Sequence, residues 1–405
     1  MQTRISNKFQ THDDIEDAEA ILRSCVHCGF CTATCPTYQL LSDELDGPRG
    51  RIYLIKQVLE GNEITRKTQS HLDRCLTCRS CETTCPSGVR YGRLVEIGRS
   101  IVDHQVTRSF KQTLQRTVLR KILPYPQRFA PLYKIALLLR PVLPENLQRK
   151  LPLPVSASTI KLNKQRKMLV LQGCVQSVVT PQTNQAATRI LEKLDIELIT
   201  ASGAGCCGAV SHHLSAADEG LEFMRRNIDA WWPHIEQGAE AIVITASGCG
   251  AVVKDYAELL KHDEHYADKA YRVSQLAKDI SEILANENFS AAKTKPTHMT
   301  VAFHSPCTLQ HGQKINGVVE KILSQAGFTL TQVADSHLCC GSAGTYSILQ
   351  PELSQQLLSN KLTSLQAEQP DVIATANIGC QMHMTSKAEV PVKHWLELIA
   401  EQLDE

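Results

Sequence analysis

The stretch KMLVLQGC at residues 167–174 decides the fold of the second half of this 405-residue chain, because its pattern returns as VAFHSPC at 301–307. Each stretch is a short, nearly continuous apolar run that ends in a cysteine. Two more runs, AIVITASGC at 241–249 and DVIATANIGC at 371–380, have the same form. Such runs are typical of strands buried in a parallel sheet. We therefore expect cysteines at the carboxyl ends of these strands, where α/β sheets build their sites.

The cysteines around these strands form an internal repeat. The tripeptide CCG occurs at 206–208 and again at 339–341, and SGCG at 247–250 corresponds to IGCQ at 378–381. The strand-end and CCG correspondences share an offset of 133 residues (339 − 206), and the last has an offset of 131 (380 − 249). Helical patterns lie between the strands. Alternating strands and helices predict two copies of an α/β unit with a parallel sheet.

The first half carries a different cysteine pattern. CVHCGFCTATCP at 25–36 and CLTCRSCETTCP at 75–86 both read C-x2-C-x2-C-x3-C-P, the ferredoxin spacing for a [4Fe–4S] cluster. In that arrangement three thiolates of one loop bind one cluster, and the fourth cysteine reaches the other cluster. The spacing thus assigns Cys25, Cys28, Cys31 and Cys85 to the first cluster, and Cys75, Cys78, Cys81 and Cys35 to the second. Two [4Fe–4S] clusters are expected here, rather than zinc or free thiols.

The segment between the two loops is expected to be helical. Pro48 can begin a helix, and RIYLIKQVLEG at 51–61 is amphipathic. Arg49 and Arg51 balance charge near the clusters, contact a partner, or lie on a solvated first turn.

Residues 104–167 form a basic, proline-rich segment. They contain fourteen Lys and Arg against one acid, a local charge of +13, so the rest of the chain sums to 1 − 13 = −12. Seven of the 17 prolines also lie there, which predicts a linker of short helices. Within it, LYKIALLLRPVL at 132–143 either rests on an anionic membrane surface or an acidic partner, or packs on a neighbouring domain. The net charge of +1 gives no reason to expect nucleic acid binding.

Sixteen cysteines in a chain long enough to bury its own core indicate metal or redox chemistry rather than disulfides. The first residues show no apolar run after a basic region, and no stretch approaches the ~18 apolar residues of a membrane span. We expect a cytoplasmic protein, either free or in peripheral contact with the inner face of the cytoplasmic membrane. The predicted fold class is mixed α/β, with four parts: a helical two-cluster domain (1–103), the linker (104–167) and two repeated α/β domains (168–290 and 291–405).

The repeats resemble the cysteine-rich CCG domains of heterodisulfide reductase and its relatives. In that family the pattern C…CCG…C-x-x-C provides five thiols for a non-cubane [4Fe–4S] cluster, but Ala246 and Asn377 stand here where the family has a further cysteine. Gly208 and Gly341 predict a positive-φ turn after each cysteine pair. The candidate ligands are two sets of four: Cys174, Cys206, Cys207 and Cys249, then Cys307, Cys339, Cys340 and Cys380. Each set holds a further iron–sulfur centre, holds zinc, or remains as buried thiols.

The whole chain resembles the iron–sulfur subunits of glycolate oxidase (glycolate dehydrogenase). The resemblance rests on SCVHCGFCTATCPTYQ (24–39), DGPRGRIYLIK (46–56), LDRCLTCRSCETTCPSGVRYGRLVEIGR (72–99) and both CCG segments. It implies an electron-transfer subunit beside a flavoprotein whose FAD oxidises glycolate, and D-lactate, to the 2-oxo acid. Electrons would leave for a quinone or another acceptor. The alternatives are a thiol/disulfide redox subunit like that of heterodisulfide reductase, or the iron–sulfur subunit of an anaerobic glycerol-3-phosphate or lactate dehydrogenase.

No side chain is assigned as catalytic, because the chain has no flavin or nicotinamide fingerprint and no acid–base constellation for a 2-hydroxy acid. Several histidines lie near the CCG cysteines, and any of them could hydrogen-bond a thiolate, although most histidines in such positions are structural and none is assigned as a catalyst: His212, His213, His304, His311, His337 and His383.

Overall fold

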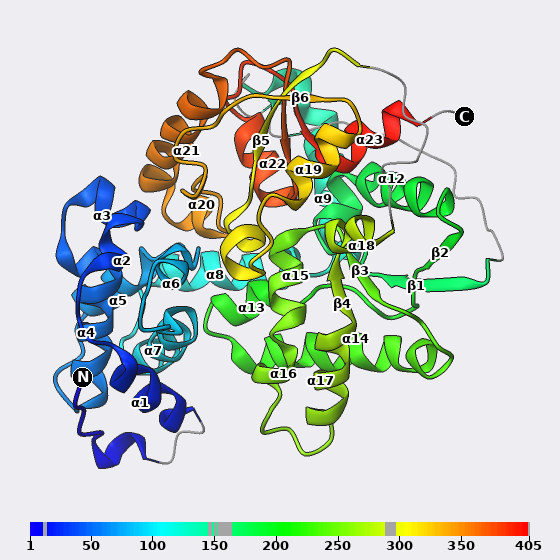
Figure 1. Ribbon diagram of the computed structural model, residues 1–405. Helices are drawn as coiled ribbons and strands as arrows, with labels where there is room; N and C mark the ends of the chain where they lie inside the picture. The colour runs from blue at the N-terminus through cyan, green and yellow to red at the C-terminus, as the bar shows by residue number, and fades with distance from the viewer. Residues whose placement is uncertain (11–13, 145–147, 150, 152–163, 288–296, 404–405) are drawn as a thin grey trace.

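A computed structural model describes the chain from residue 1 to 405, except residues 11–13, 145–147, 150, 152–163, 288–296 and 404–405. Figure 1 shows a helical N-terminal region beside two α/β units. The N-terminal elements are η1 (Asn7–Phe9), α1 (Ile15–Ser24), α2 (Phe30–Ala33), α3 (Pro36–Leu41), η2 (Glu44–Asp46), α4 (Pro48–Leu59), α5 (Arg66–Asp73), α6 (Ser80–Thr83) and α7 (Tyr91–Gln105).

Helices α4 and α7 form the centre of the N-terminal region. The helix predicted after Pro48 is confirmed, with this proline in its first turn, where no backbone donor is needed. Ile55 and Leu59 of α4 and Leu94 of α7 are fully buried in one hydrophobic cluster with Leu22 of α1. This cluster also contains Cys25, Cys75 and Cys81, so both cysteine loops pack directly on it.

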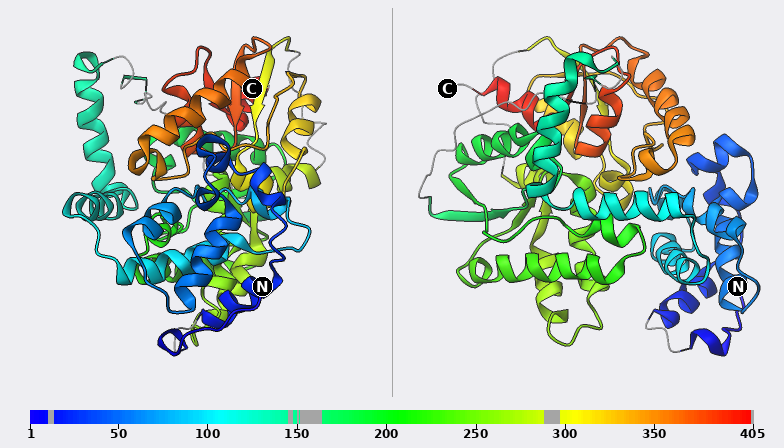
Figure 2. Two further views of the ribbon diagram at one scale, coloured as in Figure 1. Left: turned by 90° about the vertical axis from the view of Figure 1, so that its left-hand side faces the viewer. Right: turned by 180° about the vertical axis from the view of Figure 1, so that it is seen from behind.

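The basic segment forms two helices, α8 (Phe110–Ile122) and α9 (Pro126–Leu139), followed by η3 (Arg140–Val142). Ser109 and Gln112 cap the start of α8 reciprocally. At 13 and 14 residues, these helices are longer than the proline content predicts. Helix α8 contains no proline, and in α9 Pro126 occupies the first turn and the helix continues through Pro131. Seen from behind, both helices lie on one face of the molecule (Figure 2, right).

Two four-stranded parallel sheets form the second half, as predicted. The first has the order β2-β1-β3-β4, and the second has the same order in its own elements, β6-β5-β7-β8. All pairs are parallel. The strands are β1 (Arg166–Val170), β2 (Ile196–Ile199), β3 (Ile242–Ile244), β4 (Ala277–Asp279), β5 (Thr300–His304), β6 (Thr329–Leu330), β7 (Val372–Thr375) and β8 (Val392–His394).

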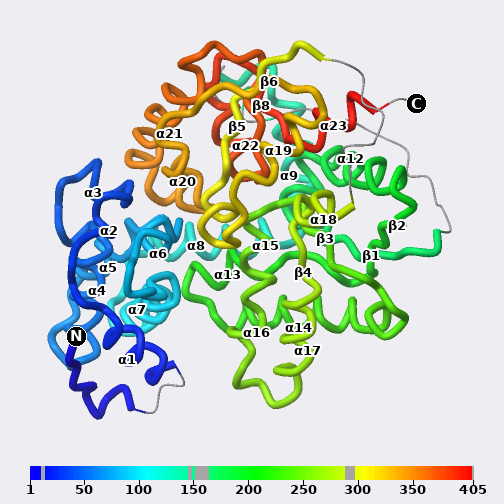
Figure 3. Tube along the Cα trace, in the orientation of Figure 1, coloured from blue at the N-terminus to red at the C-terminus, as the bar shows by residue number. Residues whose placement is uncertain are grey.

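Helices connect and cover these strands, as the tube in Figure 3 shows. In the first repeat they are α11 (Gln176–Val179), α12 (Pro181–Glu192), α13 (Ala209–His213), α14 (Ala217–Glu236), α15 (Ser247–Lys254), α16 (Tyr256–Leu259), α17 (Ala267–Leu276) and α18 (Ile280–Asn286). In the second they are η5 (Thr308–Gly312), α19 (Val318–Gln325), α20 (Tyr346–Leu349), α21 (Pro351–Gln366), α22 (Ile378–Thr385) and α23 (Trp395–Gln402).

The two repeats share one hydrophobic core. A single buried cluster contains Val243 from the first sheet, Val301 and Phe303 from the second, and Trp395 from α23. Polar contacts cross the same boundary, since His394 Nε2 lies 2.9 Å from the Thr245 carbonyl oxygen. The repeats therefore hold each other's cysteine-bearing loops at a fixed separation.

Candidate metal centres

The eight N-terminal cysteines surround two adjacent cavities. The first is lined by four thiols that the spacing assigns together, Cys25, Cys28, Cys31 and Cys85. The second is lined by Cys35, Cys75, Cys78 and Cys81. Cys81 also lines the first cavity. The chain thus brings the fourth cysteine of each motif to the other motif's loop, and the two cavities meet at Cys81.

Two buried arginines lie beside the second cavity. Arg51, 1% exposed, donates to the His71 carbonyl oxygen (2.7 Å) and to Thr37 Oγ1 (3.1 Å). Arg99 donates to the Cys75 carbonyl oxygen at 2.5 Å. Burial alone would raise the pKa of the Cys75 thiol, but these two cations lower it. A solvated position for Arg51 was a wrong alternative. Arg99 was missed because its approach to the loop depends on how α7 packs.

The donor set of both cavities fits [4Fe–4S] clusters. Each cavity offers four thiols from two separate loops, and thiolates are the ligands such clusters require. The buried cations Arg51 and Arg99 beside the second cavity would offset part of the negative charge of a thiolate-bound cluster held there. The second cavity thus offers four thiols and adjoins two buried guanidinium groups, one of which, Arg51, also pairs with buried Asp46 at 3.3 Å.

The four thiols of the first repeat gather at the carboxyl end of its sheet. Cys206 lies within hydrogen-bonding reach of Cys174 and Cys207, and Cys207 within reach of Cys249. Gly208 has φ 92°, as predicted, and its backbone N–H donates to Cys206 Sγ at 3.5 Å. Phe223 and Tyr125 pack against Cys174 and Cys206.

The second repeat builds the same turn. Gly341 has φ 86°, and its N–H donates to Cys339 Sγ at 3.5 Å. The Cys307 and Cys339 sulfurs are 3.8 Å apart, and Cys340 contacts both Cys339 and Cys380. The structure therefore brings together each predicted set of four.

The second set lies directly against the second ferredoxin motif. Leu76 and Cys78 share a buried cluster with Cys307 and Cys339. Tyr346, in the same cluster, donates from its hydroxyl to the Arg74 carbonyl oxygen at 3.1 Å. The cysteines of the second repeat thus adjoin the cavity of the second motif without an intervening layer.

Most histidines near the CCG cysteines are engaged elsewhere, as expected of structural residues. His212 and His213 pair with Glu96 of α7 at 3.4 and 3.3 Å, and although burial raises the pKa of Glu96, these histidines hold it well below its usual range. His311 bridges Thr83 and the His337 carbonyl oxygen, and His383 contacts Ser354. His304 differs, because its ring lies beside two thiols.

Comparison with known proteins agrees with this arrangement. Residues 21–89 match the family model of a 4Fe-4S dicluster domain, and residues 168–254 and 301–385 each match that of a cysteine-rich domain. The glycolate oxidase iron–sulfur subunit of Escherichia coli (strain K12) is 55% identical over 410 aligned residues, covering all of both chains. The chain belongs to the family of glycolate oxidase iron–sulfur subunits.

A more distant member supports this family assignment. The probable glycolate oxidase iron–sulfur subunit of Bacillus subtilis (strain 168) is 30% identical, covering 94% of this chain and 91% of that one. A crystal structure of a hypothetical protein from Helicobacter pylori shares the fold with a TM-score of 0.56, at 10% identity, covering 98% of this chain and 74% of that one. In the present chain, none of the described helices is both long enough and apolar enough to cross a membrane.

Proposed function

We propose that the chain is the electron-transfer subunit of a flavin-dependent 2-hydroxy-acid dehydrogenase, with glycolate, and also D-lactate, oxidised on a partner flavoprotein. The observation that carries this proposal is the pair of adjacent four-thiol cavities that meet at Cys81. The full-length similarity to an E. coli glycolate oxidase subunit supports the substrate. A quinone or another acceptor would receive the electrons.

The proposed ligands are those that line each cavity. Cys25, Cys28, Cys31 and Cys85 would hold one [4Fe–4S] cluster, and Cys75, Cys78, Cys81 and Cys35 the other. Such clusters supply one-electron carriers. The residues of this chain bind them, keep the second site away from water and balance its charge through Arg51 and Arg99. Oxidation of the substrate belongs to the flavin partner, because this sequence carries no dinucleotide fingerprint.

A single thiol tests the relay. In the complex copurified with its flavoprotein, Cys78→Ser should lower glycolate-dependent dye or quinone reduction by about 100-fold or more, because one ligand of the second site is lost. Bleaching of the flavin by glycolate should stay within about twofold of the parent. The matched control is Val26→Ala, a 68%-exposed position in the first motif, which should leave both readouts unchanged. Loss of flavin reduction in an intact complex, or unchanged dye reduction, would overturn the proposal.

We also propose that α8 and α9 rest on an anionic membrane surface. Most of the strongly exposed large apolar side chains among the described residues belong to this one segment: Phe110, Leu114, Val118, Leu132, Ile135, Leu138, Leu139 and Val142. Exposed Lys111, Arg128 and Lys134 lie among them. Apolar side chains flanked by cations suit the interface of a bilayer with anionic headgroups. The opposite face packs on the protein through buried Tyr133.

Not all of the basic charge is available to a membrane. Arg108 and Arg116 pair with Asp73, and Arg120 and Lys121 pair with Glu219. Flotation with vesicles of phosphatidylglycerol should therefore show binding that weakens, but persists, at high salt. The double variant Leu138→Ser, Val142→Ser should abolish it, while Tyr271→Ser, exposed on α17, should not. Dissociation of the flavoprotein by the double variant, with vesicle binding unchanged, would assign this face to the flavoprotein instead.

A further inference from the structure

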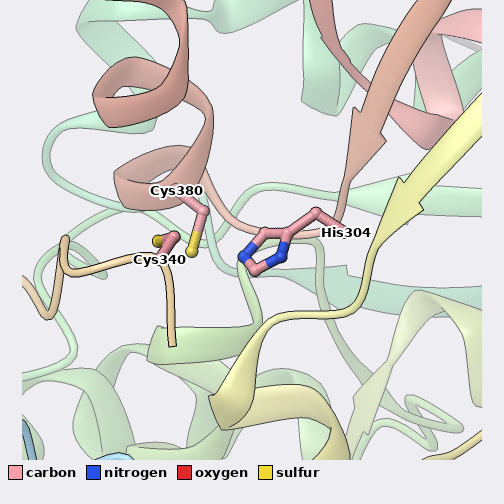
Figure 4. A group of neighbouring side chains, drawn as sticks. All are labelled: His304, Cys340 and Cys380. Carbon is pink, nitrogen blue, oxygen red and sulfur yellow. The ribbon is translucent and has the colours of Figure 1, made fainter. Parts of the chain in front are cut away.

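His304 ends β5, and its imidazole points toward two sulfurs of the second repeat (Figure 4). One ring nitrogen of His304, Cys340 Sγ and Cys380 Sγ all lie within 4.8 Å of one another. Cys340 lies in the CCG turn and Cys380 in the first turn of α22, so three separate elements converge. All three residues are buried, with His304 2% exposed.

Neither ring nitrogen of His304 has a hydrogen-bond partner among the described residues. A buried polar group without a partner is costly, and among the described residues His304 is the one histidine with both ring nitrogens in that state. The other buried histidines of this repeat are satisfied. His311 has Thr83 and the His337 carbonyl oxygen, and His394 has the Thr245 carbonyl oxygen. The unpartnered imidazole of His304 thus has an uncompensated desolvation free energy, which a bound ligand would offset.

The first repeat lacks this polar group. With the offset of 133, His304 corresponds to Leu171, which is buried in a hydrophobic cluster. Asn377 corresponds to Ala246. The Asn377 amide donates to Cys380 Sγ at 3.5 Å, and the Gly248 N–H donates to Asn377 Oδ1 at 3.2 Å. Only the second repeat therefore has both an extra nitrogen donor and a polar side chain that orients one of its thiols.

The three donor atoms all lie within 4.8 Å of one another, close to the separation that a single ion requires. Two thiolates on one zinc ion lie at most about 4.6 Å apart, twice the Zn–S bond length of about 2.3 Å. Thiolates on a cubane bind different irons and lie further apart. Among the described residues, the ferredoxin-motif thiols form no comparably close group of three. The His304, Cys340 and Cys380 spacing therefore suits one ion.

We propose that His304, Cys340 and Cys380 bind a single divalent ion of the zinc class. A mixed set of imidazole and thiolate donors is characteristic of zinc. Three protein donors leave a fourth position for a further thiolate or a water. This site is additional to the two N-terminal clusters and does not depend on the substrate of the complex.

Metal analysis of the full chain in its complex tests the site. The parent should contain about one zinc and about eight irons per chain. His304→Leu should lower zinc at least fivefold and leave iron unchanged, whereas His311→Leu should keep the zinc. His304→Cys, which retains a donor, should also keep the zinc, and it separates ligand loss from misfolding of the leucine variant. Zinc X-ray absorption should show sulfur at about 2.3 Å and nitrogen at about 2.0–2.1 Å, with the nitrogen contribution reduced in His304→Cys.

Three results would overturn the site. The first is a parent purified without chelator that holds no zinc. The second is zinc unaffected by His304→Leu. The third is extra iron and labile sulfide that disappear with His304→Leu, because that would make the centre a cluster.

Discussion

The two CCG repeats have the same strand order and the same cysteine placement, yet their sites face different surroundings. Cys174 and Cys206 of the first repeat pack against Phe223 and Tyr125. Cys307 and Cys339 of the second pack against Leu76 and Cys78 of the ferredoxin region. The duplicated scaffold has therefore been placed so that one site adjoins the second ferredoxin cavity.

The second repeat also has polar side chains where the first has apolar ones. Leu171 and Ala246 of the first correspond to His304 and Asn377 of the second. A third pair lies where each repeat's last strand meets its last helix, with Asp279 capping α18 and His394 capping α23. The comparison shows that the two copies share the backbone and the CCG turn and differ in a few buried polar side chains.

The largest expected effect tests what the repeats share. A Cβ added at Gly208 would lie 2.7 Å from the Gly220 carbonyl oxygen, and one at Gly341 would lie 2.6 Å from that of Ser354. Both positions also have positive φ. Gly208→Ala and Gly341→Ala should each lower the free energy of unfolding by about 3 kcal/mol or more, measured by anaerobic urea denaturation.

The control for these variants is Gly238→Ala, which also has positive φ but no atom near its added Cβ. This substitution should lower the free energy of unfolding by only about 1 kcal/mol, the cost of a positive φ for alanine without any steric clash. A tolerated substitution at either Gly208 or Gly341 would show that the two turns are not equivalent.

The local part of this architecture could be predicted from the sequence. Strand positions and the parallel sheets follow from apolar runs that end in cysteine, and the crossing of Cys35 and Cys85 follows from ferredoxin spacing. These features depend on residues close together in the chain, or on an internal repeat whose two copies can be aligned with each other. The lengths of α8 and α9 were underestimated because the prolines are unevenly placed. Helix α8 contains none, and Pro126 stands in the first turn of α9, where a proline costs a helix little, although Pro131 lies inside that helix.

The non-local part could not be predicted. His304 resembles five other histidines near CCG cysteines, and only the convergence of the end of β5, the CCG turn and α22 places its ring beside two sulfurs. Arg99 lies 24 residues beyond Cys75, and the fold of α7 brings it to that loop's carbonyl oxygen. Domain boundaries at 103, 167 and 290 remain predictions, although α7 extends to Gln105 and β1 begins at Arg166.

A smaller effect concerns the two capping residues, Asp279 and His394, which should change stability with pH in opposite directions. Burial raises the pKa of Asp279 to about 6, from an ordinary value near 3.8. Between these values the folded state binds more protons than the unfolded state, so stability falls as pH rises from about 4 to 6, by at most roughly 3 kcal/mol. Asp279→Asn should remove this loss and keep the cap, so the variant should gain stability relative to the parent as pH rises. Equal pH profiles would contradict the buried position of this carboxyl.

His394 should act in the opposite direction. Burial lowers its pKa to about 4, from an ordinary value near 6.5, so the unfolded state binds more protons between these values. Stability is then lost as pH falls from about 6.5 to 4, again by at most roughly 3 kcal/mol. His394→Asn should flatten that slope, although it should cost about 1–2 kcal/mol at pH 8 through loss of the contact with Thr245. A slope unchanged by this variant would assign the acid sensitivity to another group.

The smallest effect concerns the residue by which the two sites differ most. In protein depleted of zinc with its iron–sulfur content retained, His304→Leu should be neutral or stabilising by about 1–2 kcal/mol, because it removes an unpartnered buried imidazole. With zinc present the sign should reverse, since the parent alone gains binding free energy. Leu171→His in the first repeat should be destabilising by a similar amount, and zinc should restore it only if Cys207 and Cys249 can adopt the spacing of Cys340 and Cys380. If His304→Leu is destabilising without zinc, the imidazole has a partner within the protein itself, and the difference between the repeats is one of packing rather than of metal chemistry.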